Sequence, residues 1–512
     1  MPGWPAPAWF AAVAAVAVAL AAVTLAGRPL TVAAWLIGGG VLLVVTLIAP
    51  AVALFVLPLA VAFGSLLPLD VHGLHAGPTD LLLGGLVLAY LVRAAPRATG
   101  WLGVTAAEDK TTGPRSRFAV AGASLASPMR RLARREPFGL AVFAALLAYL
   151  LVVALSLLVA TSRVATLKEV IKWSEVTVVV ALGLWLLRSP RQVHVLVWGL
   201  IVAGVVEALT GYGQWVLASG ALGTNGGDIR VFGTFAQPNP YAGYLNFALP
   251  LAVALVLFGT DARERWVAGA ASVLILGAEV LASSRGGLLG IVAAALVLVV
   301  VGWRRERLAA LAALIGAPVL LVAWVAHVIP TRVQNALLAQ FRVGGVSVCG
   351  DVTSANFSTV ERVAHWVAGL RMFQAHPLLG VGAGNYDAAY ARYACADWPE
   401  SLGHAHNYYI NAAAETGILG LLAFLALVAA ALALGWRATH PRTSTLTSET
   451  ALADDTWAVA PTRALALGLF AVVAALTIHN LTDDLFVHGM ELQFALCLAC
   501  LLRLLGPPNA RH

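Results

Sequence analysis

The polar residues best placed to do chemistry in this sequence form one short block, from His404 to Asn411. Two histidines, two asparagines and two tyrosines lie in this block, and an apolar stretch of membrane length follows at once. The chain is otherwise 60% hydrophobic and only 11% charged. Polar groups gathered at the end of a membrane span are expected to be functional. A histidine there, with a pKa near neutrality, suits the removal of a proton from a hydroxyl group.

Basic residues form a second set of candidates. Arg285 lies between two apolar stretches with almost no loop, where an arginine either reaches to water or meets an anion. Taken singly, each of these residues fits anchoring to lipid headgroups. Taken together they indicate an anionic, membrane-borne substrate, because the planar fork of arginine binds phosphate oxygens bidentately. The set comprises Arg163, Lys168, Lys172, Arg230, Arg285, Arg362 and Arg371.

Membrane-spanning helices must position these groups. A mean hydropathy of +0.85 is far outside soluble globular composition, and apolar runs recur that can cross about 30 Å of hydrocarbon. We therefore predict an all-α polytopic membrane protein with about 12–14 transmembrane helices. The predicted spans are 8–26, 30–49, 51–68, 79–94, 138–160, 168–187, 192–216, 240–259, 266–283, 286–302, 308–328, 405–435, 463–480 and 485–504.

The placement of Lys and Arg predicts the orientation. The basic turns between these spans fall on one side, which is the cytoplasm by the positive-inside rule. Because the charges lie in separate turns, a nucleic-acid partner is not expected. Both termini are then cytoplasmic. The predicted parts are N-terminal transmembrane helices (1–92), a flexible basic cytoplasmic linker (93–137), a transmembrane core (138–328), one large extracytoplasmic helical loop or lid (329–404) and C-terminal transmembrane helices (405–504).

The outer loop is expected to be partly helical. Apolar residues recur at helical spacing from Ser358 to Gln374, and a second short helix is expected over 387–393. The loop is either a small cap on the membrane or a lid that lines a substrate cleft. Cys349 and Cys395 share this loop, and an oxidising compartment favours a disulfide between them. Two free thiols are the alternative.

The chain resembles the O-antigen ligase-like membrane proteins, which share their core domain with O-antigen polymerases and protein O-oligosaccharyltransferases. Four sequence blocks carry the resemblance, over roughly residues 160–500. The blocks are Arg230 with Gly233-Thr234-Phe235-Ala236-Gln237-Pro238-Asn239, Ser284-Arg285-Gly286, the Arg362 helix with His376-Pro377-Leu378-Leu379-Gly380-Val381-Gly382, and His404-Ala405-His406-Asn407 with Glu415-Thr416-Gly417.

The resemblance implies a GT-C-like, metal-independent, inverting glycosyltransferase that needs no cofactor. Its donor would be a glycan on undecaprenyl pyrophosphate, and its acceptor a glycan, lipid or protein hydroxyl on the outer face of the cell inner (cytoplasmic) membrane. Arg285 and Arg362 would bind the pyrophosphate, and His406 would orient or deprotonate the acceptor hydroxyl. The further candidates for substrate binding are Arg230, His404, Asn407, Lys168, Arg371 and Asn239.

Two alternatives remain at this point. A polymerase of the same family would use another lipid-linked glycan as its acceptor. A secondary transporter would place ionisable groups near the middle of the membrane, on broken helices in repeated halves. Here the polar groups crowd the outer ends of the spans and one outer loop, which favours the enzyme.

Overall fold

The computed structural model describes residues 30–64, 69–71, 74–76, 78–94, 137–217, 230–302, 357–395, 397–440 and 460–505. Within these residues the protein is helical apart from one antiparallel hairpin. The hairpin pairs β1 (Leu69–Val71) with β2 (Leu74–Ala76). The predicted all-α polytopic class is confirmed. Cys349, the spans 8–26 and 308–328 and most of the segment 93–137 lie outside the described residues.

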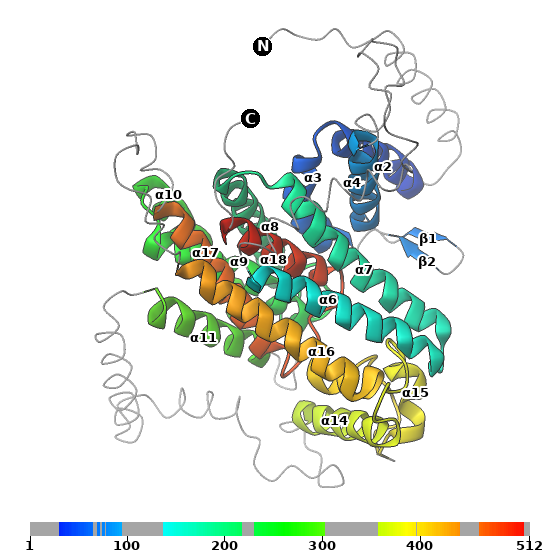
Figure 1. Ribbon diagram of the computed structural model, residues 1–512. Helices are drawn as coiled ribbons and strands as arrows, with labels where there is room; N and C mark the ends of the chain where they lie inside the picture. Colours follow the sequence, from blue (N-terminus) through cyan, green and yellow to red (C-terminus); the bar gives the residue numbers. More distant parts are fainter. Residues whose placement is uncertain are drawn as a thin grey trace, which may run out of the picture.

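Each long helix of the described bundle falls on a predicted span (Figure 1). Six of the described helices are long and apolar enough to cross a membrane by length and composition alone. The bundle helices are α2 (Leu30–Ile48), α3 (Pro50–Gly64), α4 (Pro78–Ala94), α6 (Pro137–Leu155), α7 (Arg163–Leu186), α8 (Pro190–Val216), α9 (Pro238–Phe258), α10 (Ala262–Ala282), α11 (Arg285–Val300), α16 (Tyr408–Thr439), α17 (Ala460–His479) and α18 (Met490–Leu505).

Small residues let the central helices pack closely. α9 packs against α8, α10, α11 and α17, and most of its side chains are buried. A Cβ added to Gly204 of α8 would lie 2.3 Å from the Cβ of Ala248 in α9, and one on Gly183 of α7 would lie 2.5 Å from the Cβ of Ala499 in α18. Close backbone approach of this kind is how helices associate where lipid gives no hydrophobic driving force.

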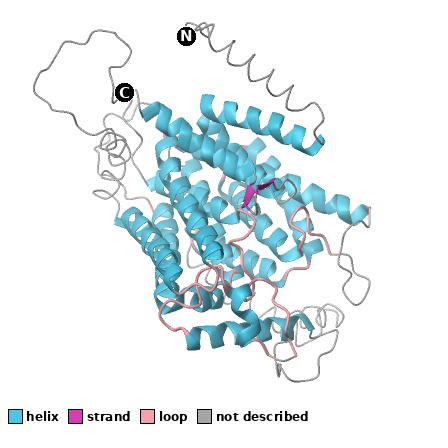
Figure 2. Cartoon of the chain, turned by 90° about the vertical axis from the view of Figure 1, so that its right-hand side faces the viewer, coloured by secondary structure: helices cyan, strands magenta, loops and turns pink. Residues whose placement is uncertain are grey.

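The candidate residues gather at one end of the bundle. Because successive helices run back and forth, this end holds the α10–α11 turn and the starts of α7, α9, α16 and α18. The turns that carry Arg188 and Arg263 lie at the other end. Figure 1 shows two further helices, α14 (Phe357–Ala375) and α15 (Tyr386–Tyr393), at the end with the candidate residues. Figure 2 shows how loops gather beside them.

These two helices form a cap with a small core of its own. The ends of both helices agree to within one residue with the ranges predicted from the sequence, 358–374 and 387–393. Met372 of α14 and Tyr386 and Tyr390 of α15 are buried together with Ala405 and Ala414. The cap therefore packs against the segment that carries the histidine block and against the first turns of α16.

A turn from the cap enters a break in α16. Gly417 has φ +65° and ψ −164°, which interrupts the helix. The backbone N–H groups of Val381 and Gly382 donate to the carbonyls of Ala414 (3.0 Å) and Glu415 (2.9 Å), respectively. The backbone N–H of Ile418 donates to the carbonyl of Pro377 (2.8 Å). The cap backbone thus satisfies groups that the break would otherwise leave unpaired in an apolar region.

The same turn is tied to the α6–α7 connection. The Oγ1 of Thr166 donates to the carbonyl of Ala383 (2.8 Å), and the Asn385 amide donates to that Oγ1 (2.8 Å). The backbone N–H of Ala383 donates to Ser156 Oγ (3.0 Å). The α6–α7 connection and α16 therefore both hold the cap at this turn.

We expect Gly417→Ala to loosen the cap. The φ and ψ of Gly417 lie in a region that is essentially restricted to glycine, so another residue costs about 1–3 kcal/mol in backbone strain. A Cβ there would also lie 2.3 Å from the carbonyl of Leu378. The thermal unfolding midpoint of the purified protein in detergent should fall. Gly213→Ala in α8 is the control, because a Cβ at Gly213 meets nothing within 4 Å. Equal midpoints for the two variants would contradict the expectation.

Candidate functional site

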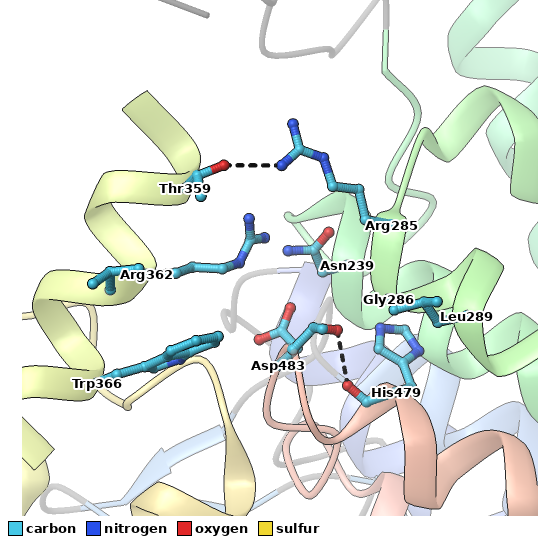
Figure 3. A pocket seen from close by; sticks show the side chains of 11 residues that line it. Asn239, Arg285, Gly286, Leu289, Thr359, Arg362, Trp366, His479 and Asp483 are labelled. Atoms are coloured by element: carbon cyan, nitrogen blue, oxygen red, sulfur yellow. Dashed lines mark hydrogen bonds between the residues drawn. The ribbon is translucent and has the colours of Figure 1, made fainter. Parts of the chain in front are cut away.

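A cavity lies between the cap and the bundle where the candidate residues gather (Figure 3). Its volume is about 130 Å³, and it is continuous with space open to solvent. Polar groups come from α9, α11, α14, α17 and the loop after α17, while three apolar side chains form part of the wall. Such a cavity fits an amphipathic ligand. The lining residues are Asn239, Arg285, Gly286, Leu289, Thr359, Arg362, Val363, Trp366, His479, Thr482 and Asp483.

Arg285 and Arg362 reach into this cavity from opposite walls (Figure 3). Arg285 is the first residue of α11, and Ser284 caps that helix by accepting a hydrogen bond from the N–H of Gly287 at 3.2 Å. Arg362 lies on α14 one turn after Thr359, whose Oγ1 accepts a 3.1 Å hydrogen bond from Arg285 Nη1. Two guanidinium groups facing one cavity suit an anion with several oxygens, such as a pyrophosphate.

Glycine is required at the start of α11. A Cβ on Gly286 would lie 2.4 Å from both His479 Cδ2 and Thr482 Oγ1, so α11 can begin against the end of α17 only without one. The N-terminal end of α11 therefore opens at the cavity, and α9 also begins there with Asn239 in its first turn. The partial positive charge of both helix ends adds to that of the arginines.

Arg230 lies behind Arg285, at the end of α10. Its guanidinium donates to the carbonyls of Ala282 and Ser283, at 3.1 Å each, and so holds the turn from which Arg285 projects. Burial lowers the pKa of Arg230, and the positive charges of Arg362 and Arg285 lower it further. Three cations are therefore close enough to repel one another, and a bound anion would relieve that repulsion.

His406 is held with one ring nitrogen on a carboxylate. Its backbone has φ +49°, a left-handed conformation that few residues other than glycine adopt. Its Nδ1 lies 3.4 Å from Asp483 Oδ1. An ionised carboxylate only accepts hydrogen bonds, so Nδ1 carries the proton and Nε2 is left basic. That Nε2 is buried and has no hydrogen-bond partner among the described residues.

The surroundings favour a neutral His406 beside an ionised Asp483. Burial lowers the pKa of His406, and the charges of His404 and Arg362 lower it further, while Asp483 acts in the opposite direction. Burial alone would raise the pKa of Asp483, but its hydrogen bond with His406 and the nearby positive charges hold it well below its ordinary value. A neutral imidazole with a free ring nitrogen is the form that accepts a proton.

His404, His406 and Asp483 also form the one group of potential metal ligands found in the described part of the chain, with ligand atoms within 4.8 Å of one another. Hydrogen bonds account for the arrangement of this group without a metal ion. His404 Nδ1 accepts the backbone N–H of His406 at 3.1 Å, so a neutral His404 carries its proton on Nε2, which lies 3.9 Å from Asp483 Oδ1. Both ring nitrogens that face Asp483 thus bear protons instead of lone pairs.

The side chain of Asn407 hydrogen-bonds backbone groups. It caps α16 by accepting the N–H groups of Tyr409 (3.0 Å) and Ile410 (3.1 Å), and its amide donates to the carbonyl of Leu481 (2.8 Å). These contacts fix the start of α16 against the loop that carries Asp483. The structure therefore gives Asn407 a part in placing the two members of the His406–Asp483 pair.

Four of the six predicted substrate-binding residues line neither this cavity nor the second cavity described below: Arg230 and Asn407, whose contacts are given above, and Lys168 and Arg371. Lys168 is exposed on α7. Arg371 is exposed on α14 and donates to the carbonyls of Tyr393 (3.1 Å) and Ala394 (3.3 Å), at the end of α15. On α7 it is Lys172, one turn after Lys168, that lines a cavity.

We call the cavity lined by Arg285 and Arg362 the arginine cavity. Five of its residues were not singled out from the sequence: Leu289, Trp366, His479, Thr482 and Asp483. Two adjacent aspartates, Asp483 and Asp484, stand in the short outer turn between the last two predicted spans, and that pair was a readable signal. Trp366 follows Arg362 by four residues, so helical spacing places both on one face of α14. His479 had no such signal, because it ends an apolar stretch.

A sequence model of the family described as O-Antigen ligase matches residues 270–425. The matched region includes Arg285, Arg362, His406 and the break at Gly417, but not Asp483. No curated protein matches the chain. The resemblance to an O-antigen ligase-like family, first read from the sequence blocks, is confirmed by this match.

We expect the arginine cavity to bind lipid pyrophosphates. Arg285→Ala removes a charge-assisted contact worth roughly 1.5–3 kcal/mol, so affinity for farnesyl pyrophosphate should fall by roughly tenfold or more. Arg362→Ala should act similarly. Arg285→Lys should rescue only in part, because an ammonium group cannot form the planar fork. Binding to purified protein can be measured by calorimetry. Arg265→Ala, in the turn at the opposite end, is the control, and equal affinities for all variants would refute the site.

Proposed function

We propose that this O-antigen ligase-like protein transfers a glycan from undecaprenyl pyrophosphate to an acceptor hydroxyl group on the extracytoplasmic face of the cytoplasmic membrane. The observation that carries the proposal is that two arginines and Asp483 line one cavity beside apolar side chains, and that the same carboxylate holds the ring of His406 behind the wall of that cavity. The arginines suit the pyrophosphate. The apolar wall at Leu289 and Val363 suits the first part of the lipid.

The geometry supports direct displacement. The acceptor oxygen attacks the anomeric carbon while the bond from that carbon to the pyrophosphate oxygen breaks, and the pyrophosphate leaves with the electron pair. The hydroxyl proton passes to Nε2 of His406, and Asp483 stabilises the imidazolium ion that results. Arg285 and Arg362 neutralise the charge that develops on the leaving group. A single displacement inverts the anomeric configuration, and no step requires a metal ion.

The break in α16 gives no support to a transporter. Broken helices in transporters present unpaired backbone groups to ions and substrates. Around Gly417 the groups of Ala414, Glu415 and Ile418 are bonded to the cap instead. A polymerase activity remains a close alternative to the ligase activity, because a polymerase would use the same chemistry on a lipid-linked acceptor. The envelope glycans of a deletion strain separate the two: a ligase defect leaves long lipid-linked chains, and a polymerase defect leaves single repeat units.

Transfer should depend on pH through His406. Because burial lowers the pKa of His406, the base stays neutral and the rate stays constant down to below the ordinary histidine value of about 6.5. Asp483 opposes that shift, so Asp483→Asn should lower the pKa further. The acidic limb of the pH–rate profile then moves to lower pH, and the maximal rate falls because the imidazolium ion loses its counter-charge. Single-turnover transfer from a radiolabelled donor measures both effects.

His406→Ala should reduce transfer by about 10²–10⁴-fold, the usual contribution of a general base, with affinity for farnesyl pyrophosphate nearly unchanged. His376→Ala is the matched control, since the side chain of His376 is exposed just after α14 and, among the described residues, its ring hydrogen-bonds Tyr393. Transfer by His406→Ala at the wild-type rate would show that the assigned role is wrong.

The predicted orientation places this site outside the cytoplasm. In a background with Cys349 and Cys395 replaced by Ser, Glu400→Cys lies exposed near the cap and Arg263→Cys lies exposed at the opposite end. A membrane-impermeant maleimide applied to intact spheroplasts should label position 400 only. Labelling of position 263 alone would reverse the orientation and put the cavity on the cytoplasmic side.

A further inference from the structure

A second cavity lies on the other side of the histidine block. It is enclosed by α6, α7, the first turns of α16, the cap turn at Ala383 and Gly384, and the loop after α17. Its volume is about 310 Å³. Small-molecule sites in proteins occupy about 300–1,000 Å³. The cavity is therefore large enough to hold a ligand of its own.

The two cavities share a thin wall. Asp483 lines the arginine cavity, and the next residue, Asp484, lines the second one. His404 also lines the second cavity, while its Nε2 lies 3.9 Å from Asp483 Oδ1 and its ring centre lies 4.5 Å from that of His406. The proposed base thus stands between a site that holds two arginines and a separate site that no step of the donor chemistry uses.

The second cavity is rich in carboxyl groups. Its lining holds three of them, from Glu169, Glu415 and Asp484, and one ammonium group, from Lys172. The Nζ of Lys172 lies 2.7 Å from Glu169 Oε2 and donates to the carbonyl of Phe486 at 3.2 Å. Carboxyl groups therefore outnumber cations in this lining, which makes it a less favourable place for an anion than the arginine cavity.

The lining also carries neutral polar groups and aromatic rings. Tyr149 and Tyr408 meet through their hydroxyl groups at 3.0 Å, and Asn411 stands one turn into α16. Carboxylates accept hydrogen bonds from hydroxyl and ammonium groups but cannot donate to another carboxylate or a phosphate. This set of groups matches a molecule rich in hydroxyl groups that carries no negative charge at this point.

We propose that the second cavity binds a carbohydrate portion of the acceptor, neutral or amine-bearing, and discriminates against acceptors with a carboxylate or phosphate there. The inference rests on the proposed function, because it assigns the second substrate of the same transfer. The two linings, arginines in one cavity and carboxyl groups in the other, sort the two substrates. The pyrophosphate-bearing donor is disfavoured in the acceptor site, and the acceptor approaches the base from the His404 side.

The test uses three probes that differ in one substituent: methyl β-glucoside, methyl β-glucosaminide and methyl β-glucuronide. Saturation-transfer NMR on the purified full-length protein gives their dissociation constants. The glucoside and glucosaminide should bind at least roughly tenfold more tightly than the glucuronide. Glu169→Gln should narrow that difference by roughly fivefold, because it removes one negative charge without adding volume.

A space-filling variant locates the binding. Ala412 lines the second cavity, so Ala412→Leu should abolish glucoside binding while farnesyl pyrophosphate still binds, which also shows that the variant is folded. Ala426→Leu, exposed on the same helix, is the matched control. Saturating farnesyl pyrophosphate should leave glucoside binding unchanged, because the two sites are separate.

The outcomes separate this inference from the proposed function. Glucoside binding that survives Ala412→Leu, competes with farnesyl pyrophosphate or shows no preference over the glucuronide would overturn the acceptor site and leave the donor site standing. Failure of the wild-type protein to bind farnesyl pyrophosphate would instead overturn the proposed function itself.

Discussion

The docking of the cap into the break of α16 is the constraint on which the site depends. Arg362 is carried by the cap, whereas Arg285 and Asp483 are carried by the bundle, so their separation is set by where the cap lies. Three backbone hydrogen bonds around Gly417 fix that position. Backbone contacts in an apolar setting are difficult to exchange for water. The cap is therefore seated firmly at this point, and its other end bounds the arginine cavity.

Electrostatics indicates which ligand this arrangement favours. The positive charges of Arg362 and Arg285 lower the pKa of Arg230, and half-buried cations this close together are relieved by a bound anion. The helix starts of α9 and α11 add partial positive charge at the same place. The first cavity thus favours an anion, and burial together with the charges of His404 and Arg362 lowers the pKa of His406 in spite of Asp483.

Much of the fold and part of the candidate site could be predicted from the sequence, and the physical reasons also explain which parts could not. Hydropathy located the spans, because each helix needs an apolar stretch long enough to cross the membrane, and helical spacing located α14. Arg285 and Arg362 stood out against the charge bias of membrane loops. Asp483 was missed although its position in an outer turn was visible. The second cavity could not be predicted, because its lining comes from segments that only tertiary packing brings together, and Lys172 enters it where Lys168 had been expected to serve.

The loop between α17 and α18 also has a consequence for how such proteins can vary. Asp483 and Asp484 are neighbours in the chain but border different chambers. The position of each aspartate in the loop therefore decides which chamber its side chain borders, just as the position of a residue in a strand decides which face it lies on. Inserting or deleting one residue in this loop would shift both aspartates by one position, so that one chamber would receive the neighbour's aspartate and the other would lose its acidic group, even though composition and net charge of the loop were almost unchanged. Comparisons between related chains should accordingly count residues in this loop, since its length carries information that its amino-acid content does not.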